Sequence, residues 1–331
     1  MNLLDNPFYV LGVDPETSRE KLVRLVDDLA LQDPDPALLA GARSLLHPKQ
    51  RLSAEVHWLP GVPSSRAREL AERLKVSPGP ILPERDGLHG LAGHNVVVTA
   101  IEQGGNGHSL TDLARGLAFL SLFQFEFDAH DIRQSINDAR RVAGFPPVRE
   151  IDVIDQELAR VRTEGALAIR RILENLSVEQ LATVLASAVE SFWHRCKDPA
   201  AGTLIFSAIT DYENRASEEI QERAEKFVGL LSLGAVLPLV FGMETRWIGD
   251  LEQALTSWLE LTRPMVANSA IHGFSWEPLE DLEGVINEAA IVTHMMTGRL
   301  ELAVNLRTSL VNIIVRERSR YSRLRQPAAV P

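Results

Sequence analysis

Helical periodicity recurs along almost the whole chain, and it constrains the fold more than any other feature of the sequence. In the second half, apolar residues return every three or four positions over long stretches with short connections between them. The apolar face of such a helix must pack against another element. The pattern therefore predicts an all-α protein whose C-terminal part is a helical bundle or a stack of helical hairpins. Long helices are expected at 151–175, 177–196, 200–233, 245–261 and 278–325, the last with a break near Thr297-Gly298.

The first half predicts shorter helices separated by turn residues. Helix starts are expected at Asn6-Pro7, at Thr17-Ser18 and at Ser109, because such side chains accept hydrogen bonds from the free N–H groups of a first turn. The best strand candidate, NVVVTAI at 95–101, lies within a longer helical pattern. We expect a domain at 1–62, a helical middle region at 63–148 with a Pro- and Gly-rich linker at 77–93, a long-helix bundle at 149–326 and a disordered tail at 327–331.

The overall charge and the single cysteine narrow the classes of function. The net charge of −11 repels phosphate backbones, so we expect no nucleic-acid partner. One cysteine, Cys196, excludes an intrachain disulfide framework and a cysteine-rich zinc site. The first sixteen residues place acidic side chains where a signal peptide has positive charge followed by an apolar run. These features together predict a cytoplasmic protein.

The first sixty residues resemble a J-domain, the module that docks co-chaperones onto 70-kDa heat-shock chaperones. The resemblance lies in NPFYVLGVDPETSREKLVRLVDDLALQ and in LLAGARSLLHPKQRLSAEVHWL, where Pro7, Leu11-Gly12-Val13, Leu29-Ala30-Leu31, Pro48-Lys49 and Arg51 match the family pattern. It implies a three-helix domain, a chaperone of that type as the partner, and a docking surface on the second helix and the loop after it. The partner-binding residues that it implies are Lys21, Arg24, Asp33, Pro34 and Asp35.

The sequence departs from the J-domain pattern where the family contacts its chaperone. The family's His-Pro-Asp tripeptide is replaced by Asp33-Pro34-Asp35, one residue short in spacing, and the family's basic second helix here contains Asp27 and Asp28. Like charges weaken docking onto an acidic chaperone surface. We therefore expect little or no stimulation of a chaperone's ATP hydrolysis.

The remainder of the chain resembles bacterial proteins that carry a J-like domain ahead of a long helical region. The residues that carry this second resemblance are Trp258, Pro264, Gly273, Glu277 and Pro278, within 255–282, together with His94-Asn95. It implies a helical architecture and a co-chaperone-like or scaffold-like role.

Two C-terminal features are candidates for partner binding. Trp258 and Trp276 flank Pro264 and Gly273, and such a non-helical corner either anchors a partner or packs a helix junction. Five arginines crowd the end of the last helix, where they either meet an acidic partner, an anionic lipid surface or nucleic acid, or complement the helix dipole. The arginines singled out for binding are Arg316, Arg320 and Arg323.

Catalytic signatures are scarce. The densest group of possible ligands is Glu126, Asp128, His130 and Asp131, but Asp128 is also a natural helix cap. No HExxH, paired CxxC or GxSxG motif occurs, so we predict a non-enzymatic protein without a metal or cofactor. A dispersed metal site near 126–131 remains an alternative.

One uncharged stretch, 227–243, leaves a membrane alternative open. Its length is at the lower limit for crossing a bilayer, and Pro238 and several glycines interrupt it. A buried helix end followed by a turn is one interpretation; a peripheral membrane protein is the other. The leading functional prediction is an adaptor or scaffold that mediates protein–protein interactions.

Overall fold

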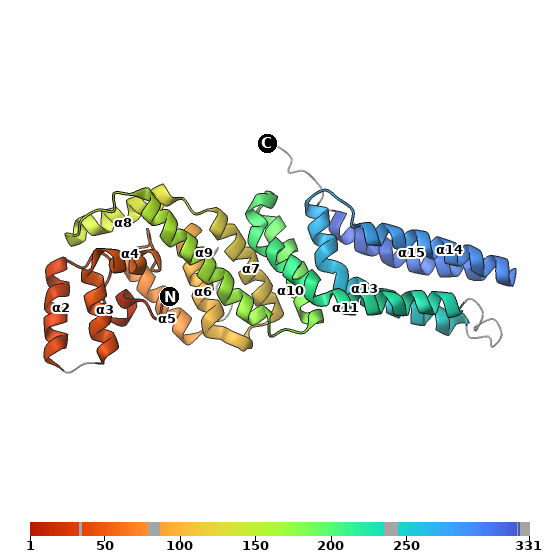
Figure 1. The fold of residues 1–331 in the computed structure, drawn as a ribbon, viewed down its shortest axis with the longest axis horizontal. Helices are drawn as coiled ribbons and strands as arrows, with labels where there is room; N and C mark the ends of the chain where they lie inside the picture. The colour runs from red at the N-terminus through yellow and green to blue at the C-terminus, as the bar shows by residue number, and fades with distance from the viewer. Residues whose placement is uncertain (33–34, 79–86, 235–243, 323, 325–331) are drawn as a thin grey trace. The chain divides into compact units, whose positions relative to one another are not determined.

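The structure is a computed structural model that describes residues 1–32, 35–78, 87–234, 244–322 and 324 of the 331-residue chain. Every regular element among these residues is a helix and none is a strand, which confirms the predicted all-α class (Figure 1). The chain divides into two compact units, Met1–Asn175 (the N-terminal unit) and Leu176–Pro331 (the C-terminal unit).

The N-terminal unit contains short helices followed by one long helix. Its elements are α1 (Pro7–Val10), α2 (Arg19–Leu31), α3 (Pro36–Leu46), α4 (Pro48–Val56), α5 (Ser64–Val76), α6 (Gly90–Gly104), a 3-10 turn η2 (Gly105–Gly107), α7 (Leu110–Phe125), α8 (Ala129–Ala143) and α9 (Ile151–Leu173).

The C-terminal unit is built from longer helices. Its elements are α10 (Val178–Arg195), a 3-10 turn η3 (Pro199–Gly202), α11 (Thr203–Gly234), α13 (Glu244–Ile271), α14 (Glu277–Thr297) and α15 (Leu300–Ser322). The helix α11 packs against α13, while α14 and α15 form an antiparallel pair (Figure 1). The predicted break of the last helix is confirmed, because Gly298 adopts a φ of 70° that ends α14 in the left-handed region.

Local sequence signals account for most helix starts. Asn6 accepts a hydrogen bond from the Phe8 N–H, Ser18 accepts one from Lys21, and Ser109 accepts one from Asp112, as the cap positions predicted. The β-branched run at 95–101 lies inside α6 and is almost entirely buried. Burial of this helix on several sides outweighs the strand propensity of its valines.

The observed division of the chain differs from the expected boundaries at 62 and 148. One hydrophobic cluster joins Phe8, Leu45 and Trp58 to Leu70 and Val96, so the first sixty residues share their core with the helices that follow. The helix α9 packs against α4, α6, α7 and α8, which places it in the N-terminal unit and moves the boundary to residue 175.

A carboxylate shared by two arginines lies inside the N-terminal unit. Arg51 and Glu55 on α4 and Arg140 on α8 are exposed by only 0%, 2% and 3%. The Nε atom of Arg51 donates to Glu55 Oε1 at 2.7 Å, and the Nε atom of Arg140 donates to Glu55 Oε2 at 2.8 Å. Both oxygens of the carboxylate are therefore held by charged donors.

The other donors of the two arginines reach backbone carbonyls of separate segments. Arg51 donates to the Pro15 carbonyl at 2.6 Å, and its guanidinium lies 3.8 Å from the centre of the Phe145 ring. Arg140 donates to the carbonyls of Pro48 and Pro146, each at 3.2 Å. This charged triad thereby ties α4 to α8, to the turn before α2 and to the turn after α8.

The helix α13 continues through Pro264, where the sequence predicted a non-helical corner. Proline offers no N–H to the carbonyl one turn earlier and crowds that carbonyl. Here the Tyr212 hydroxyl of α11 donates to the Leu261 carbonyl at 2.7 Å in the buried interior. The carbonyl that loses its helical donor is that of the exposed Glu260, one residue earlier. The Tyr212 bond therefore fastens α11 to α13 beside the disruption, and Pro264 is itself buried among apolar neighbours. The expectation of a helix ending at 261 was therefore wrong.

The uncharged stretch at 227–243 is only partly within the described residues. Phe227 and Leu231 are buried in the last turns of α11, and 235–243 lies outside the described part. Among the described helices, none combines the length and the apolar character that crossing a bilayer requires.

Replacing Glu55 tests the charged triad. We expect Glu55→Ala to lower the free energy of unfolding by about 3–5 kcal/mol, because it leaves two buried guanidinium groups without a carboxylate. Urea unfolding followed by circular dichroism measures the loss. Asp138→Ala, which removes the partner of the exposed Arg141, is the control and should leave the transition unchanged. A loss for Glu55→Ala no larger than that of the control would contradict this account.

Candidate partner-binding surfaces

The helix α2 exposes most of its surface. All of its residues are described, and only Leu22 among them is fully buried. It packs mainly against α3. Lys21 and Arg24, both predicted to bind a partner, are exposed, as are the apolar side chains of Val23 and Leu31, the latter by 86%. The structure thus places two cations and two apolar side chains on a helix whose packing uses few of its residues.

The connection between α2 and α3 holds the other predicted contact residues. Asp33 and Pro34 lie outside the described residues. Asp35 is exposed, and its Oδ1 atom accepts a hydrogen bond from the Ala37 N–H at 2.9 Å, which caps α3. Asp35 therefore has a local structural role that is independent of any partner.

The two tryptophans singled out by the sequence contact each other. The rings of Trp258 and Trp276 stack with their centres 5.5 Å apart and 30° between their planes. Trp258 is buried on α13 and Trp276 is half-buried at the start of α14. Gly273 has a φ of 80° in the turn between these helices, a conformation that favours glycine. The ring pair therefore packs the junction between α13 and α14.

The predicted C-terminal arginines differ in exposure and in their ion pairs. Arg316 is exposed, whereas Arg320 forms an ion pair with Glu190 of α10 at 3.1 Å. Their neighbour Arg318 pairs with Glu283 of α14 at 2.6 Å. Arg323 lies outside the described residues. Two of these cations thus hold α15 to neighbouring helices of the same unit.

The acidic group at 126–131 is used for local structure. The Asp128 carboxylate caps α8 by accepting from the N–H groups of His130 and Asp131, and these bonds lower the pKa of Asp128. Glu126 accepts from the Gly90 N–H at 2.9 Å. Within the described ranges, no group of three or more histidine, cysteine, aspartate or glutamate side chains is placed to hold a metal ion.

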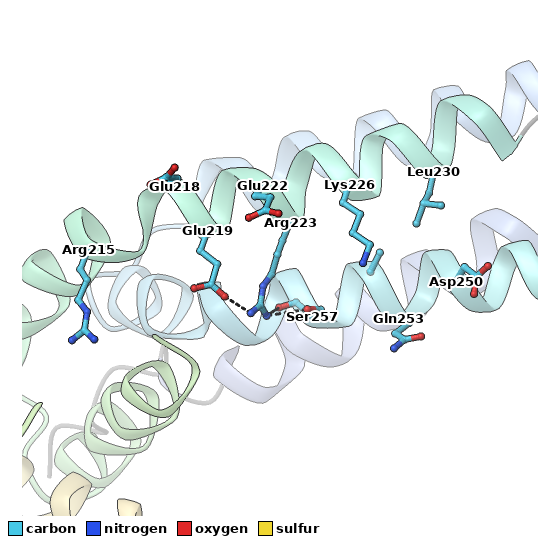
Figure 2. A pocket seen from close by; sticks show the side chains of 11 residues that line it. Arg215, Glu218, Glu219, Glu222, Arg223, Lys226, Leu230, Asp250, Gln253 and Ser257 are labelled. Atoms are coloured by element: carbon cyan, nitrogen blue, oxygen red, sulfur yellow. Dashed lines mark hydrogen bonds and ion pairs between the residues drawn. The ribbon is translucent and has the colours of Figure 1, made fainter. Parts of the chain in front are cut away.

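A polar groove between α11 and α13 was not anticipated from the sequence. It has a volume of about 920 Å³, and charges of both signs line it, including Glu222, Lys226 and Asp250. Figure 2 shows Arg223 reaching from α11 toward Ser257 on α13. The guanidinium of Arg223 pairs with Glu219 and with Glu179, and it donates to the Ser257 hydroxyl at 2.9 Å. The contacts of Arg223 thus join α10, α11 and α13, and they stabilise the C-terminal unit.

The turn between α14 and α15 carries an apolar surface that we name the hairpin tip. Its side chains have no charge and are at least half exposed, Met295 by 77%. Patches of exposed apolar side chains commonly mark sites of interaction, and methionine adapts to partners of different shape. The hairpin tip consists of Ile291, Val292, Met295, Met296, Leu300 and Val304.

Two buried histidines lie in the N-terminal unit, and one of them pairs with a glutamate. The Nε2 atom of His57 lies 3.0 Å from Glu164 Oε2, and its Nδ1 atom lies 2.8 Å from the Ser53 carbonyl. His94 is exposed by only 1%, and a Cβ on Gly165 would meet its Nε2 atom at 2.5 Å. The ring of His94 is thus enclosed by α9 and has no route to a substrate.

Burial lowers the pKa of His94, whereas ion pairs lower the pKa of Glu164. Burial lowers the pKa of His94 to about 4, although its contact with Asn95 opposes the shift. Burial would raise the pKa of Glu164, but the Met1 amine, His57 and Arg160 outweigh it and lower the value to about 2. His94 is therefore neutral at physiological pH and serves as a polar member of the core.

Comparisons with protein-family models, with curated proteins and with solved structures gave no match to this chain. The assignment of a function consequently rests on the surfaces described above.

The enclosed His94 predicts a pH dependence of stability. The unfolded chain binds a proton at His94 near pH 6.5, whereas the folded protein does so only near pH 4, so acidification favours unfolding between these values. We expect the free energy of unfolding to fall by up to about 3 kcal/mol across this window. Denaturant titrations at several pH values measure the slope.

The variant His94→Gln should flatten that slope, leaving the smaller contribution of His57, whose pKa burial also lowers. His130→Gln replaces an exposed histidine and should retain the full slope. Equal slopes in all three proteins would show that His94 titrates normally in the folded state.

Proposed function

We propose that the protein is a non-enzymatic adaptor that binds other proteins, with α2 as a principal contact helix. The observation that carries the proposal is the exposure of Lys21, Val23, Arg24 and Leu31 on a helix with a single fully buried residue. Exposed apolar side chains gain free energy when a partner covers them. The cations beside them select a partner surface that is acidic or of mixed charge.

The buried charged triad gives α2 a fixed support, which favours the same proposal. The hairpin of α2 and α3 adjoins α4, where Arg51 and Glu55 belong to the buried charged triad. A contact helix on a fixed support loses little conformational entropy when a partner binds. The J-domain resemblance likewise implies a docking surface on this helix.

The hairpin tip supports a scaffold rather than a single docking module. It belongs to the C-terminal unit, whereas α2 belongs to the N-terminal unit. Its methionines and aliphatic side chains offer an apolar contact surface. We therefore propose that each unit provides its own partner surface.

Charge reversal on α2 tests the proposed contact. We expect Lys21→Glu combined with Arg24→Glu to lower partner recovery by about tenfold or more in affinity purification, because it replaces the two contact cations with carboxylates and makes a helix of balanced charge strongly acidic. Quantitative mass spectrometry of the purified complexes measures the recovery. Arg115→Glu changes an exposed arginine of α7 and should leave recovery unchanged. Equal loss in both variants, or in neither, would contradict the role of α2.

The charge balance of α2 also makes a prediction about chaperones. The helix contains three cations, Arg19, Lys21 and Arg24, and three carboxylates, Glu20, Asp27 and Asp28. We expect the purified protein to leave the ATP hydrolysis of a 70-kDa heat-shock chaperone near its basal rate, since a helix without net positive charge is poorly steered to an acidic surface. A J-domain protein with an intact His-Pro-Asp tripeptide is the positive control. Several-fold stimulation by the present protein would contradict this prediction.

A further inference from the structure

A small pocket opens in the C-terminal unit where the ends of α13 and α15 meet the start of α14. It has a volume of about 290 Å³, which is near the lower end of the range for ligand pockets. One wall is apolar and consists of Val266, Ala270, Trp276, Leu279 and Val315. The stacking of Trp276 on Trp258 holds the largest side chain of this wall in place.

Tyr321 gives the pocket an unused hydrogen-bond donor. Its side chain lines the pocket and is only 1% exposed, yet its hydroxyl finds no hydrogen-bond partner among the described residues. Burial raises the pKa of Tyr321, so the hydroxyl keeps its proton. A buried hydroxyl without a partner is costly, and an acceptor that entered the pocket would recover that cost.

The remaining charged groups select against an anion. Arg318 lines the pocket, but its Nη1 atom already donates to Glu283 at 2.6 Å and its Nη2 atom to the Leu279 carbonyl at 3.4 Å. Glu280 contributes an exposed carboxylate. Besides the serine hydroxyls that line it, the pocket therefore offers the Tyr321 donor, the Glu280 acceptor and an apolar wall, while the Arg318 cation is already paired.

We propose that this pocket binds a neutral peptide segment of a partner protein through one apolar side chain. The side chain of leucine size packs against Trp276 and Leu279, the segment's carbonyl accepts from the Tyr321 hydroxyl, and a peptide N–H donates to Glu280. The volume accommodates one such residue with its flanking peptide groups. The inference rests on the proposed adaptor function and specifies what the C-terminal unit recognises.

Binding of N-acetyl-leucinamide to the full-length protein tests the proposal. This neutral compound carries the side chain, the carbonyl and the N–H of one residue. Two-dimensional NMR of protein with labelled tryptophan follows the indole signals of Trp276 and Trp258. We expect a saturable shift, no saturable shift with N-acetylglycinamide, which lacks the side chain, and weaker binding of N-acetyl-leucine, whose carboxylate meets Glu280.

Tyr321→Phe separates recognition from stability. Removal of the hydroxyl should weaken binding of N-acetyl-leucinamide roughly fivefold to tenfold, the effect of one hydrogen bond, while the melting temperature stays equal or rises because a buried unpaired group is lost. A purely structural hydroxyl would lower the melting temperature instead. Ala270→Leu, which fills the apolar wall, should abolish binding.

Three results would overturn the proposal: no saturable shift in the wild-type protein, equal affinity in Tyr321→Phe, or tighter binding of N-acetyl-leucine than of the amide. The last would identify an anion site. Because these measurements use the isolated protein, failure here leaves the α2 experiment unaffected. Loss of the α2 effect, conversely, would remove the proposed N-terminal contact without changing the result for the pocket.

Discussion

The N-terminal unit depends on the shared carboxylate of Glu55. Two guanidinium groups converge on it from α4 and α8, and all three side chains are almost inaccessible to water. Charges are buried at such cost that the arrangement persists only when every partner is in place. The requirement fixes the register of α4 against α8 and, through the Pro15 and Pro146 carbonyls, the turns around them. It also ties the first sixty residues to α8 and the turn after it, across the boundary expected at 62.

Features specified by neighbouring residues could be predicted from the sequence. The helical class follows from the spacing of apolar positions, and the starts of α2 and α7 follow from Ser18 and Ser109, whose side chains cap N–H groups three residues away. The break at Gly298 follows from the rarity of left-handed backbone in other residues. Each of these involves a few adjacent residues, so the sequence contains the whole interaction.

Features specified by distant residues could not be predicted. Arg140 meets Glu55 across 85 positions, and Tyr212 reaches the Leu261 carbonyl near Pro264 across 49. From the sequence alone, Pro264 ends a helix and Arg140 has no visible partner, because nothing nearby reveals Tyr212 or Glu55. The same holds for the candidate surfaces: the exposure of Lys21 and Arg24 agrees with the helical pattern, whereas the unpartnered hydroxyl of Tyr321 emerges only when three helices are assembled.

The two exposed surfaces proposed for binding, α2 and the hairpin tip, share one physical origin. A helix in the interior of a bundle has neighbours on several sides, as α6 does, and nearly all of its side chains are buried. By contrast, α2 packs mainly against α3, and the end of α14 packs against α15, so an apolar side chain that turns away from that one neighbour stays in water. Leu31 and Met295 are such side chains, and their exposure costs solvation free energy in the isolated protein. Contact with another protein would recover this free energy, and for this reason we propose the end of α2 and the hairpin tip, rather than the buried histidines or the paired arginines, as contact surfaces.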